Sequence, residues 1–233
     1  MAPLSRLLAL AWLRALLLTE LGGAGLLALV VLTESTATGR DPMARLLADV
    51  PHTWALLSPS LGLVGAALAV DGMRRRGDWL TLATLGVHRA RVLLSVLVLA
   101  APLGLLAAMV EGLTQPATAV LRVSGGWLVE GRLLLDPGAA PPSEAALEAA
   151  RWLGSWRWPG TALFLVAGAL TGASLGSRAP GTVVLVVTFG WLVADLLRRG
   201  SSPGGAAIWA LLVCGSAAIS LAWALRGREE LRG

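Results

Sequence analysis

The segment Gly172-Ala-Ser-Leu-Gly176 has the spacing of a nucleophile elbow, in which a serine lies between two glycines on a sharp turn. Ser174 could attack a carbonyl group only if a base lay within hydrogen-bonding reach to accept its proton. The chain has two histidines, His52 and His88, and neither is predicted at the depth of Ser174. Because this base is missing, we do not expect serine chemistry. No pair of acidic residues or metal-binding cluster in the sequence suggests another enzyme activity, so we expect none from the chain.

The same segment carries a stripe of small residues. Gly168, Gly172 and Gly176 recur every four positions and define the glycine stripe, which lets another helix approach closely within a membrane. The chain contains no lysine and therefore no phosphate-binding G-x-x-x-x-G-K-[ST] loop. We expect any ATP to be hydrolysed by a partner subunit, and we expect no cofactor and no metal in this chain.

Three charged residues stand out beside apolar segments. Glu20 lies inside the first segment, where a carboxylate is costly and often functional, but it also lies near enough to the cytoplasmic edge to reach water. Arg198 and Arg199 follow a later segment, and they can meet an anionic headgroup or, for Arg199, pair with Asp195 four residues earlier. We treat Glu20, Arg198 and Arg199 as candidates to contact a substrate or form a gate.

The segment from Met73 to Arg91 predicts a short helix flanked by arginines. One interpretation is an interfacial helix that lies on lipid. The other is a coupling helix that docks into a groove of an ATPase, with the Asp78 carboxylate accepting from a basic residue of that partner. The residues assigned to this ATPase coupling are Asp78, Trp79, Leu82, Gly86 and His88.

The composition indicates an integral membrane protein. Of 233 residues, 56% are hydrophobic and 14% are charged, which is more apolar surface than a soluble domain of this length can bury. The net charge of +5 comes from arginines near the ends of apolar segments, so it indicates membrane orientation rather than nucleic-acid binding. The single cysteine, Cys214, excludes a disulfide within the chain.

Six apolar segments are long enough to predict membrane-spanning helices. They cover about Ala15 to Leu32, Trp54 to Val70, Val92 to Val110, Pro159 to Leu175, Val183 to Leu197, and Ala206 to Leu225. We therefore predict an all-α membrane protein with one transmembrane domain, 1–233, and an extracytoplasmic loop from Glu111 to Arg157. Within this loop we predict a small hairpin turning at Gly125–Gly126 and a short helix capped by Ser143.

The arginines predict the orientation. A cytoplasmic N-terminus places eleven arginines inside and eight outside, and the inside ones cluster at the ends of spans. Both termini and the segment from Met73 to Arg91 are then expected in the cytoplasm.

Three stretches resemble the lipopolysaccharide-export permeases, the two transmembrane subunits of the ABC machine that extracts lipopolysaccharide from the inner membrane. "MRRRGDWLTLATLGVHRARVLL" resembles the family's cytoplasmic loop between the second and third spans. "RWPGTALFLVAGALTGASLGSR" resembles its fourth span, and "LLRRGSSPGGAAIWALLVCGSAAISLAWALRGR" resembles the link into its last span. The resemblance implies a lipid-moving permease subunit of a bacterial inner membrane, with a cytoplasmic ABC ATPase and a second permease subunit, the same or different, as partners.

The chain also departs from that family. The loop from Glu111 to Arg157 is too short for the periplasmic β-jellyroll of the family. Glu34 stands near the place where the family has a basic residue for lipid phosphates. Two alternatives stay open: an ABC-2 type permease similar to the haem-export subunits, and a non-transporting membrane subunit that scaffolds a larger complex.

Overall fold

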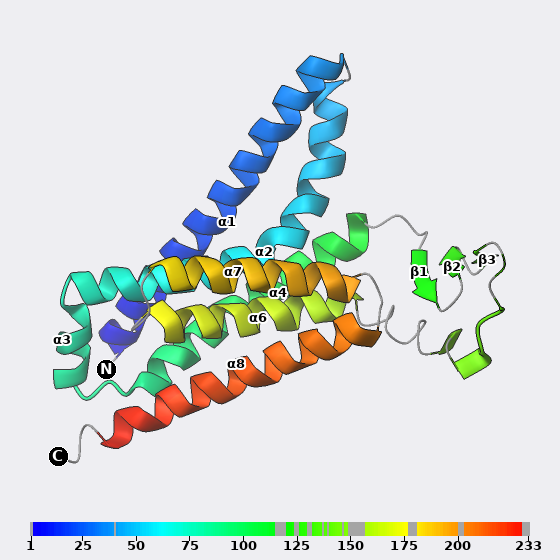
Figure 1. Cartoon of the computed structure of the whole chain (residues 1–233). Coiled ribbons are helices and arrows are strands. Elements are labelled where there is room, and N and C mark those ends of the chain that lie inside the picture. The colour runs from blue at the N-terminus through cyan, green and yellow to red at the C-terminus, as the bar shows by residue number, and fades with distance from the viewer. Residues whose placement is uncertain are drawn as a thin grey trace.

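The chain is almost entirely helical. The computed structural model describes residues 2–39, 41–114, 120–123, 126–129, 132–136, 138, 140–145, 147–148, 157–176, 181–199 and 203–229. The long helices are α1 (Ala2–Thr38), α2 (Pro42–Arg75), α4 (Arg89–Thr114), α6 (Arg157–Gly176), α7 (Gly181–Arg199) and α8 (Pro203–Glu229), and α3 (Asp78–Thr84) is short (Figure 1). Each of the six predicted apolar segments lies within one long helix, which extends past the segment at both ends.

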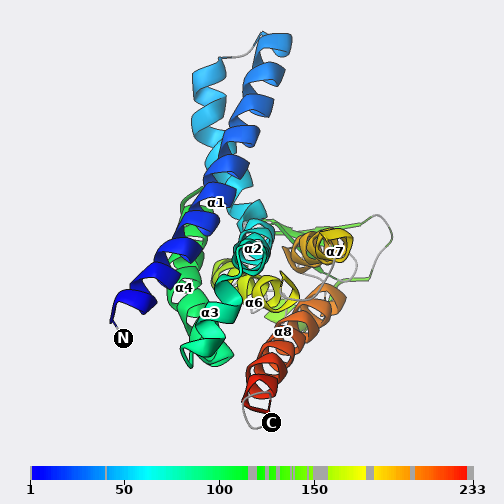
Figure 2. The same ribbon diagram turned by 90° about the vertical axis from the view of Figure 1, so that its left-hand side faces the viewer.

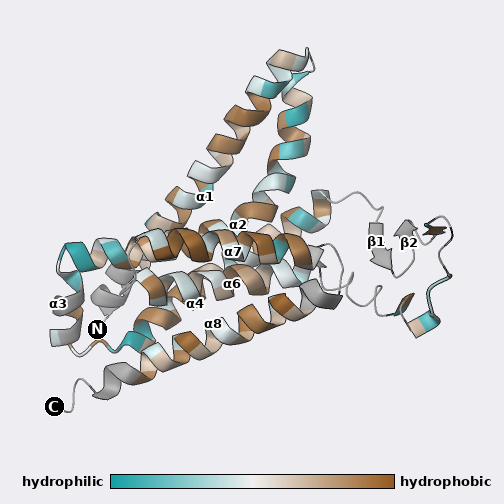
Figure 3. Ribbon diagram, in the orientation of Figure 1, coloured by the Kyte–Doolittle hydropathy of each residue, from teal (hydrophilic) through white to brown (hydrophobic). Residues whose placement is uncertain are grey.

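The helices have the length and composition of a multi-pass membrane protein. Five of them are long and apolar enough to cross a membrane, in the segments Ala9–Thr38, Pro42–Arg75, Arg89–Thr114, Pro159–Gly176 and Ala207–Leu225. The apolar part of α7, Gly181–Leu197, is shorter. In Figure 3 apolar residues dominate the long helices, and hydrophilic residues gather around α3 and at the tip of the α1–α2 hairpin.

The bundle has two distinct ends, with α6 at its centre. Helix α6 packs against α2, α4, α7 and α8. Both termini and α3 lie at one end, and the small β-sheet lies beyond the other end (Figures 1 and 2). The elements predicted to share the cytoplasmic side therefore share one end of the molecule.

Helices α1 and α2 form an antiparallel hairpin that leaves the bundle. Pro51 and Pro59 lie inside α2, and a proline within a helix removes a backbone hydrogen bond and kinks the axis. The second part of α2 lies among the bundle helices, whereas the first part turns away and projects together with the outer part of α1 (Figures 1 and 2). The hairpin is therefore splayed from the bundle at the end opposite α3.

The glycine stripe of α6 faces α2 of the same chain. A Cβ atom at Gly168 would lie 2.7 Å from the carbonyl oxygen of Pro59. A Cβ atom at Gly172 would lie closer still to the carbonyl oxygen of Leu63, and Gly176 has the same relation to Ala67 one turn further on. The two backbones are thus in direct contact along about two turns. The stripe is covered within the chain, so it does not offer a surface to a second subunit.

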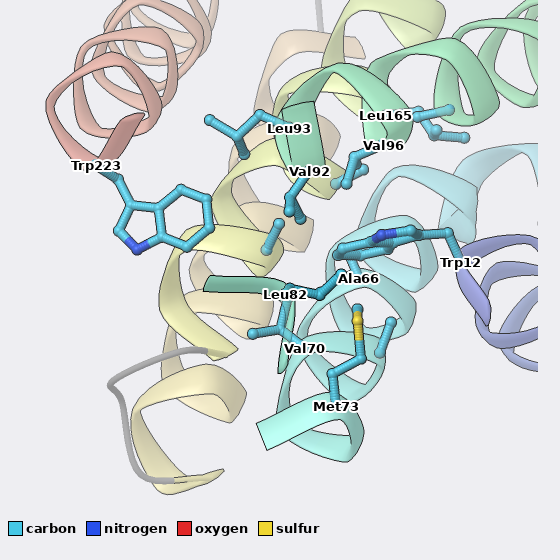
Figure 4. Close-up of a cluster of buried hydrophobic side chains, with 14 of the residues drawn as sticks. Trp12, Ala66, Val70, Met73, Leu82, Val92, Leu93, Val96, Leu165 and Trp223 are labelled. Atoms are coloured by element: carbon cyan, nitrogen blue, oxygen red, sulfur yellow. The ribbon is translucent and has the colours of Figure 1, made fainter. Parts of the chain in front are cut away.

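Two clusters of buried apolar side chains fill the bundle. In the larger cluster, Trp12 of α1, Leu82 of α3 and Trp223 of α8 meet side chains from α2, α4 and α6 (Figure 4). In the smaller one, the Phe164 ring of α6 stacks on the Trp191 ring of α7, with centroids 4.3 Å apart. The first cluster ties α3 and both terminal helices to one end of the bundle.

The connection between α4 and α6 contains a three-stranded antiparallel sheet, where the sequence predicted a small hairpin within an otherwise helical chain. The strands are β1 (Val120–Val123), β2 (Gly126–Val129) and β3 (Arg132–Leu135), in that order. Val123 pairs with Gly126, which places Gly126 in a strand and not in the predicted turn. A hydrogen bond from the Leu147 N–H to the Ser143 carbonyl lies where the short capped helix was predicted.

The α2–α6 contact predicts that Gly172 tolerates no side chain. Gly172→Ala pushes a methyl group into the Leu63 carbonyl, and we expect it to lower the free energy of unfolding by about 1–3 kcal/mol, as overpacking does. The measurement is denaturant unfolding of the purified protein in detergent. Gly25→Ala on α1 is the matched control, because a Cβ atom there meets nothing within 4 Å. Equal stability of the two variants would contradict the contact.

Candidate functional site

Glu20 lies at the contact between α1 and α2. Its side chain is only 2% exposed. Small residues allow the two helices to approach here: a Cβ atom at Gly65 of α2 would lie 3.3 Å from the Leu16 Cα atom of α1. Gly23, one turn beyond Glu20, is similarly covered by the Leu61 side chain. The sequence folds locally into a tight hairpin that encloses the carboxyl group.

The carboxyl group of Glu20 is held by two side chains of α2. The Ser58 hydroxyl donates to Oε1 at 3.3 Å, and the Trp54 side chain also donates to the carboxyl group. Oε2 has no hydrogen-bond partner among the described residues. Among the described residues no cation faces the Glu20 carboxyl group. A buried carboxylate without a neighbouring cation costs several kcal/mol of free energy. Glu20 is thus a polar contact between helices, available for one further interaction through Oε2.

Glu20 is enclosed by its own chain. Because it is only 2% exposed, its carboxyl group does not reach water at the helix edge, which was one of the two interpretations left open.

The short helix α3 is bounded by two glycines that adopt left-handed backbone angles. Gly77 before it has a φ of 75° and Gly86 after it has a φ of 69°, conformations that favour glycine. The Val87 N–H donates to the Leu82 carbonyl at 2.9 Å, which closes a Schellman motif around Gly86. The local sequence therefore fixes both ends of a helix of seven residues.

One face of α3 is anchored in the chain's own core. Leu82 is buried in the larger cluster, and Val87 packs against that cluster. Thr81, Thr84, Leu85 and His88 are exposed instead. Among the residues predicted to meet an ATPase, Leu82 therefore faces inward, His88 and Gly86 face outward, and the Trp79 side chain lies outside the described part.

Asp78 has a partner within the loop. Its carboxylate accepts from the Arg76 Nε atom at 2.9 Å, and both side chains are largely exposed. Arg75 pairs likewise with Asp71 of α2, at 2.7 Å. Exposed pairs of this kind contribute about 0–1 kcal/mol, so the Asp78 carboxylate can exchange Arg76 for another cation at little cost.

Glu111 is a second buried carboxyl group, although the sequence predicts it at the start of the extracytoplasmic loop. It lies in the last turn of α4, is fully buried, and accepts a hydrogen bond from the Thr161 hydroxyl of α6. The nearby Thr114 hydroxyl lies 3.5 Å from the His52 ring of α2. The sequence signal for this group of polar side chains is an acidic residue directly after an apolar run, Glu111 in "AAMVEG".

The remaining candidates are placed as follows. Arg198 and Arg199 are the last two residues of α7, and their side chains lie outside the described part, as does the predicted pairing of Arg199 with Asp195. The Ser174 hydroxyl donates to the Leu170 carbonyl at 2.9 Å and lies 3.4 Å from the Ser220 hydroxyl of α8. Ser174 thus contributes to packing between α6 and α8.

A scan against protein-family models finds no match to the chain, and a search of curated proteins finds none either. The fold and the two sites therefore define the class no further than an almost wholly helical protein with five helices suited to crossing a membrane.

The hydrogen bonds of Glu20 predict different effects for two substitutions. Glu20→Gln keeps an acceptor without a charge, and we expect its unfolding free energy to stay within about 1 kcal/mol of the unmodified chain. Glu20→Ala leaves the Ser58 and Trp54 donors unpaired and should cost about 1–3 kcal/mol. Denaturant unfolding in detergent measures both.

The matched control is Glu34→Ala on the same helix, because Glu34 is exposed and forms only a surface pair with Arg45. This control should change the unfolding free energy by less than about 1 kcal/mol. A Glu20→Gln variant as unstable as Glu20→Ala would show that the folded state needs the charged form.

Proposed function

We propose that the chain is the transmembrane permease subunit of an ABC transporter that moves a lipid or another amphiphile out of the bacterial inner membrane. It acts with a cytoplasmic ABC ATPase and with a second permease subunit. In this proposal α7 also crosses the membrane, as the fifth of six spans, and both termini and α3 are cytoplasmic. The support comes from the resemblance of the loop around Asp78 and, above all, from the way α3 is held.

The observation that carries the proposal is the anchoring of α3. Leu82 fixes one face of the helix in the core, while Thr81, Thr84 and Leu85 remain exposed at the end that holds both termini. Leu85 is 57% exposed although it is a large apolar residue at a tip rich in charges. A rigid, capped helix that presents such a face suits docking into a groove of another protein better than it suits lying on lipid.

Helix α2 provides a mechanical link from α3 to the splayed hairpin. Only Arg76 and Gly77 separate α2 from α3, and α2 continues through the bundle to its kink and on to the contact with Glu20. A tilt of α3 on a closing ATPase would therefore be passed along α2 to the α1–α2 hairpin. In a pair of permease subunits, α1 and α7 would line a lateral gate for the amphiphile.

The exposed face of α3 predicts which substitutions break ATPase binding. Leu85→Glu places a charge in the docking face and should reduce co-purification of the co-expressed ATPase at least about tenfold, the effect of roughly 1.4 kcal/mol. Leu134→Glu in β3 is the control, because Leu134 is equally exposed at the opposite end, and it should have no effect.

Asp78→Asn adds a second arm to this experiment. The Asn side chain keeps the size and an acceptor oxygen of Asp78 but carries no charge to pair with a cation of the ATPase, so we expect weaker binding or ATP hydrolysis without transport. If the unmodified chain binds no ATPase, it is not a permease subunit of this kind but a membrane scaffold or a protein that works alone. Binding that survives both substitutions would exclude α3 as the docking element.

The orientation predicts which side labels an introduced cysteine. In a Cys214→Ala background, Arg76→Cys should react with a membrane-impermeant thiol reagent only in inverted vesicles, because α3 is cytoplasmic in the proposal. Leu134→Cys in β3 should react only in intact spheroplasts. The opposite pattern would reject the topology and the coupling role together.

A further inference from the structure

A groove runs between α7 and α8, with α6 as its floor. It has a volume of about 580 Å³, and its walls include Val187 and Trp191 of α7 and Leu212 and Ile219 of α8. Thr171 of α6 contributes to the floor. None of the residues assigned above to ATPase docking lines it.

Two glycines leave the groove open. Gly190 of α7 and Gly215 of α8 both line it, and a Cβ atom at either position would meet no atom within 4 Å. This differs from the glycine stripe of α6, where the missing side chains are replaced by the backbone of α2. At Gly190 and Gly215 the missing side chains leave a hollow, so close helix packing does not explain these glycines.

The groove offers an apolar lining. The two hydroxyl groups in its lining donate to carbonyls of their own helices: Thr171 donates to the Ala167 carbonyl at 2.9 Å, and Ser216 donates to the Val213 carbonyl at 2.8 Å. The wall residue Leu211 is 72% exposed on α8, which is one of the five helices suited to crossing a membrane. A groove with this lining on helices of that composition suits an apolar chain as its occupant.

One end of the groove adjoins the two arginines that end α7. Leu197 lines the groove, and Arg198 and Arg199 follow it directly as the last residues of α7. Asp195 is the one acidic residue in the last turn and a half, so this helix end keeps a net positive charge. Basic residues at a membrane surface attract anionic lipid headgroups, each with about 1 kcal/mol.

We propose that the groove binds one acyl chain of an anionic bilayer phospholipid, whose headgroup lies at Arg198 and Arg199. The site belongs to the outer face of α7 and α8 and does not depend on the proposed transport function. The bound lipid is a resident of the surrounding bilayer, held by the shape of the groove and by charge at its end.

The experiment is photo-crosslinking of the full chain, purified in detergent, with phosphatidylglycerol that carries a photoreactive acyl chain. We expect labelled peptides from α7 and α8, and at least about fivefold less labelling of them in Gly190→Leu/Gly215→Leu, where side chains fill the hollow. Gly22→Leu/Gly25→Leu on α1 is the control, because these positions are also open, and it should leave labelling unchanged. Labelling spread evenly over the exposed faces of α1, α4 and α8, or unchanged in the filled groove, would overturn the site.

The headgroup assignment is tested in the same assay with phosphatidylcholine carrying the same acyl chain. Phosphatidylglycerol should label α7 and α8 more strongly, and Arg198→Gln/Arg199→Gln should remove this preference, with a loss of about fivefold for each arginine. Equal labelling by the two lipids in the unmodified chain would overturn the anionic headgroup. Size-exclusion profiles matching the unmodified chain show that each variant is folded.

Discussion

The backbone contact between α6 and α2 is the constraint on which the rest of the structure depends. Association of helices in a membrane relies on close packing, since burial of apolar groups brings no gain over lipid. The glycine stripe of α6 brings the two backbones together along the second part of α2. With that part fixed on α6, the proline-containing stretch of α2 sends the first part out of the bundle together with α1 (Figure 1).

Helix α2 thereby joins the two sites of the molecule. At one end it leads through Gly77 into α3, whose Leu82 is fixed in the same core that receives Trp12 of α1. At the other end its Ser58 and Trp54 hold the Glu20 carboxyl group. In the proposed permease, a movement that begins at α3 reaches the hairpin without crossing a flexible loop, because capped helices and packed side chains connect the two places.

The long helices could be predicted from the sequence because a span must be apolar over its whole length. Their ends could not, since helices such as α1 and α2 continue into polar residues beyond the apolar run, where hydropathy carries no signal. The spacing of the glycine stripe predicted close packing but not its partner, because spacing along one helix contains no information about which helix lies opposite. For the same reason the burial of Leu82 and of Glu20, and the contact between Glu111 and Thr161, could be found only from the three-dimensional arrangement. The sheet was predicted only as a hairpin, since its third strand lies in a short run of leucines without alternation.

The most direct test of the account is hydrogen exchange of the detergent-purified chain with and without a co-expressed ATPase. We predict slower exchange of the backbone amides of residues 78–91 in the complex, together with altered exchange in α1 and α2 near Glu20, because α2 links the two places. Protection confined to the sheet region, or protection of α3 with no change at the hairpin, would contradict the link that α2 is inferred to provide.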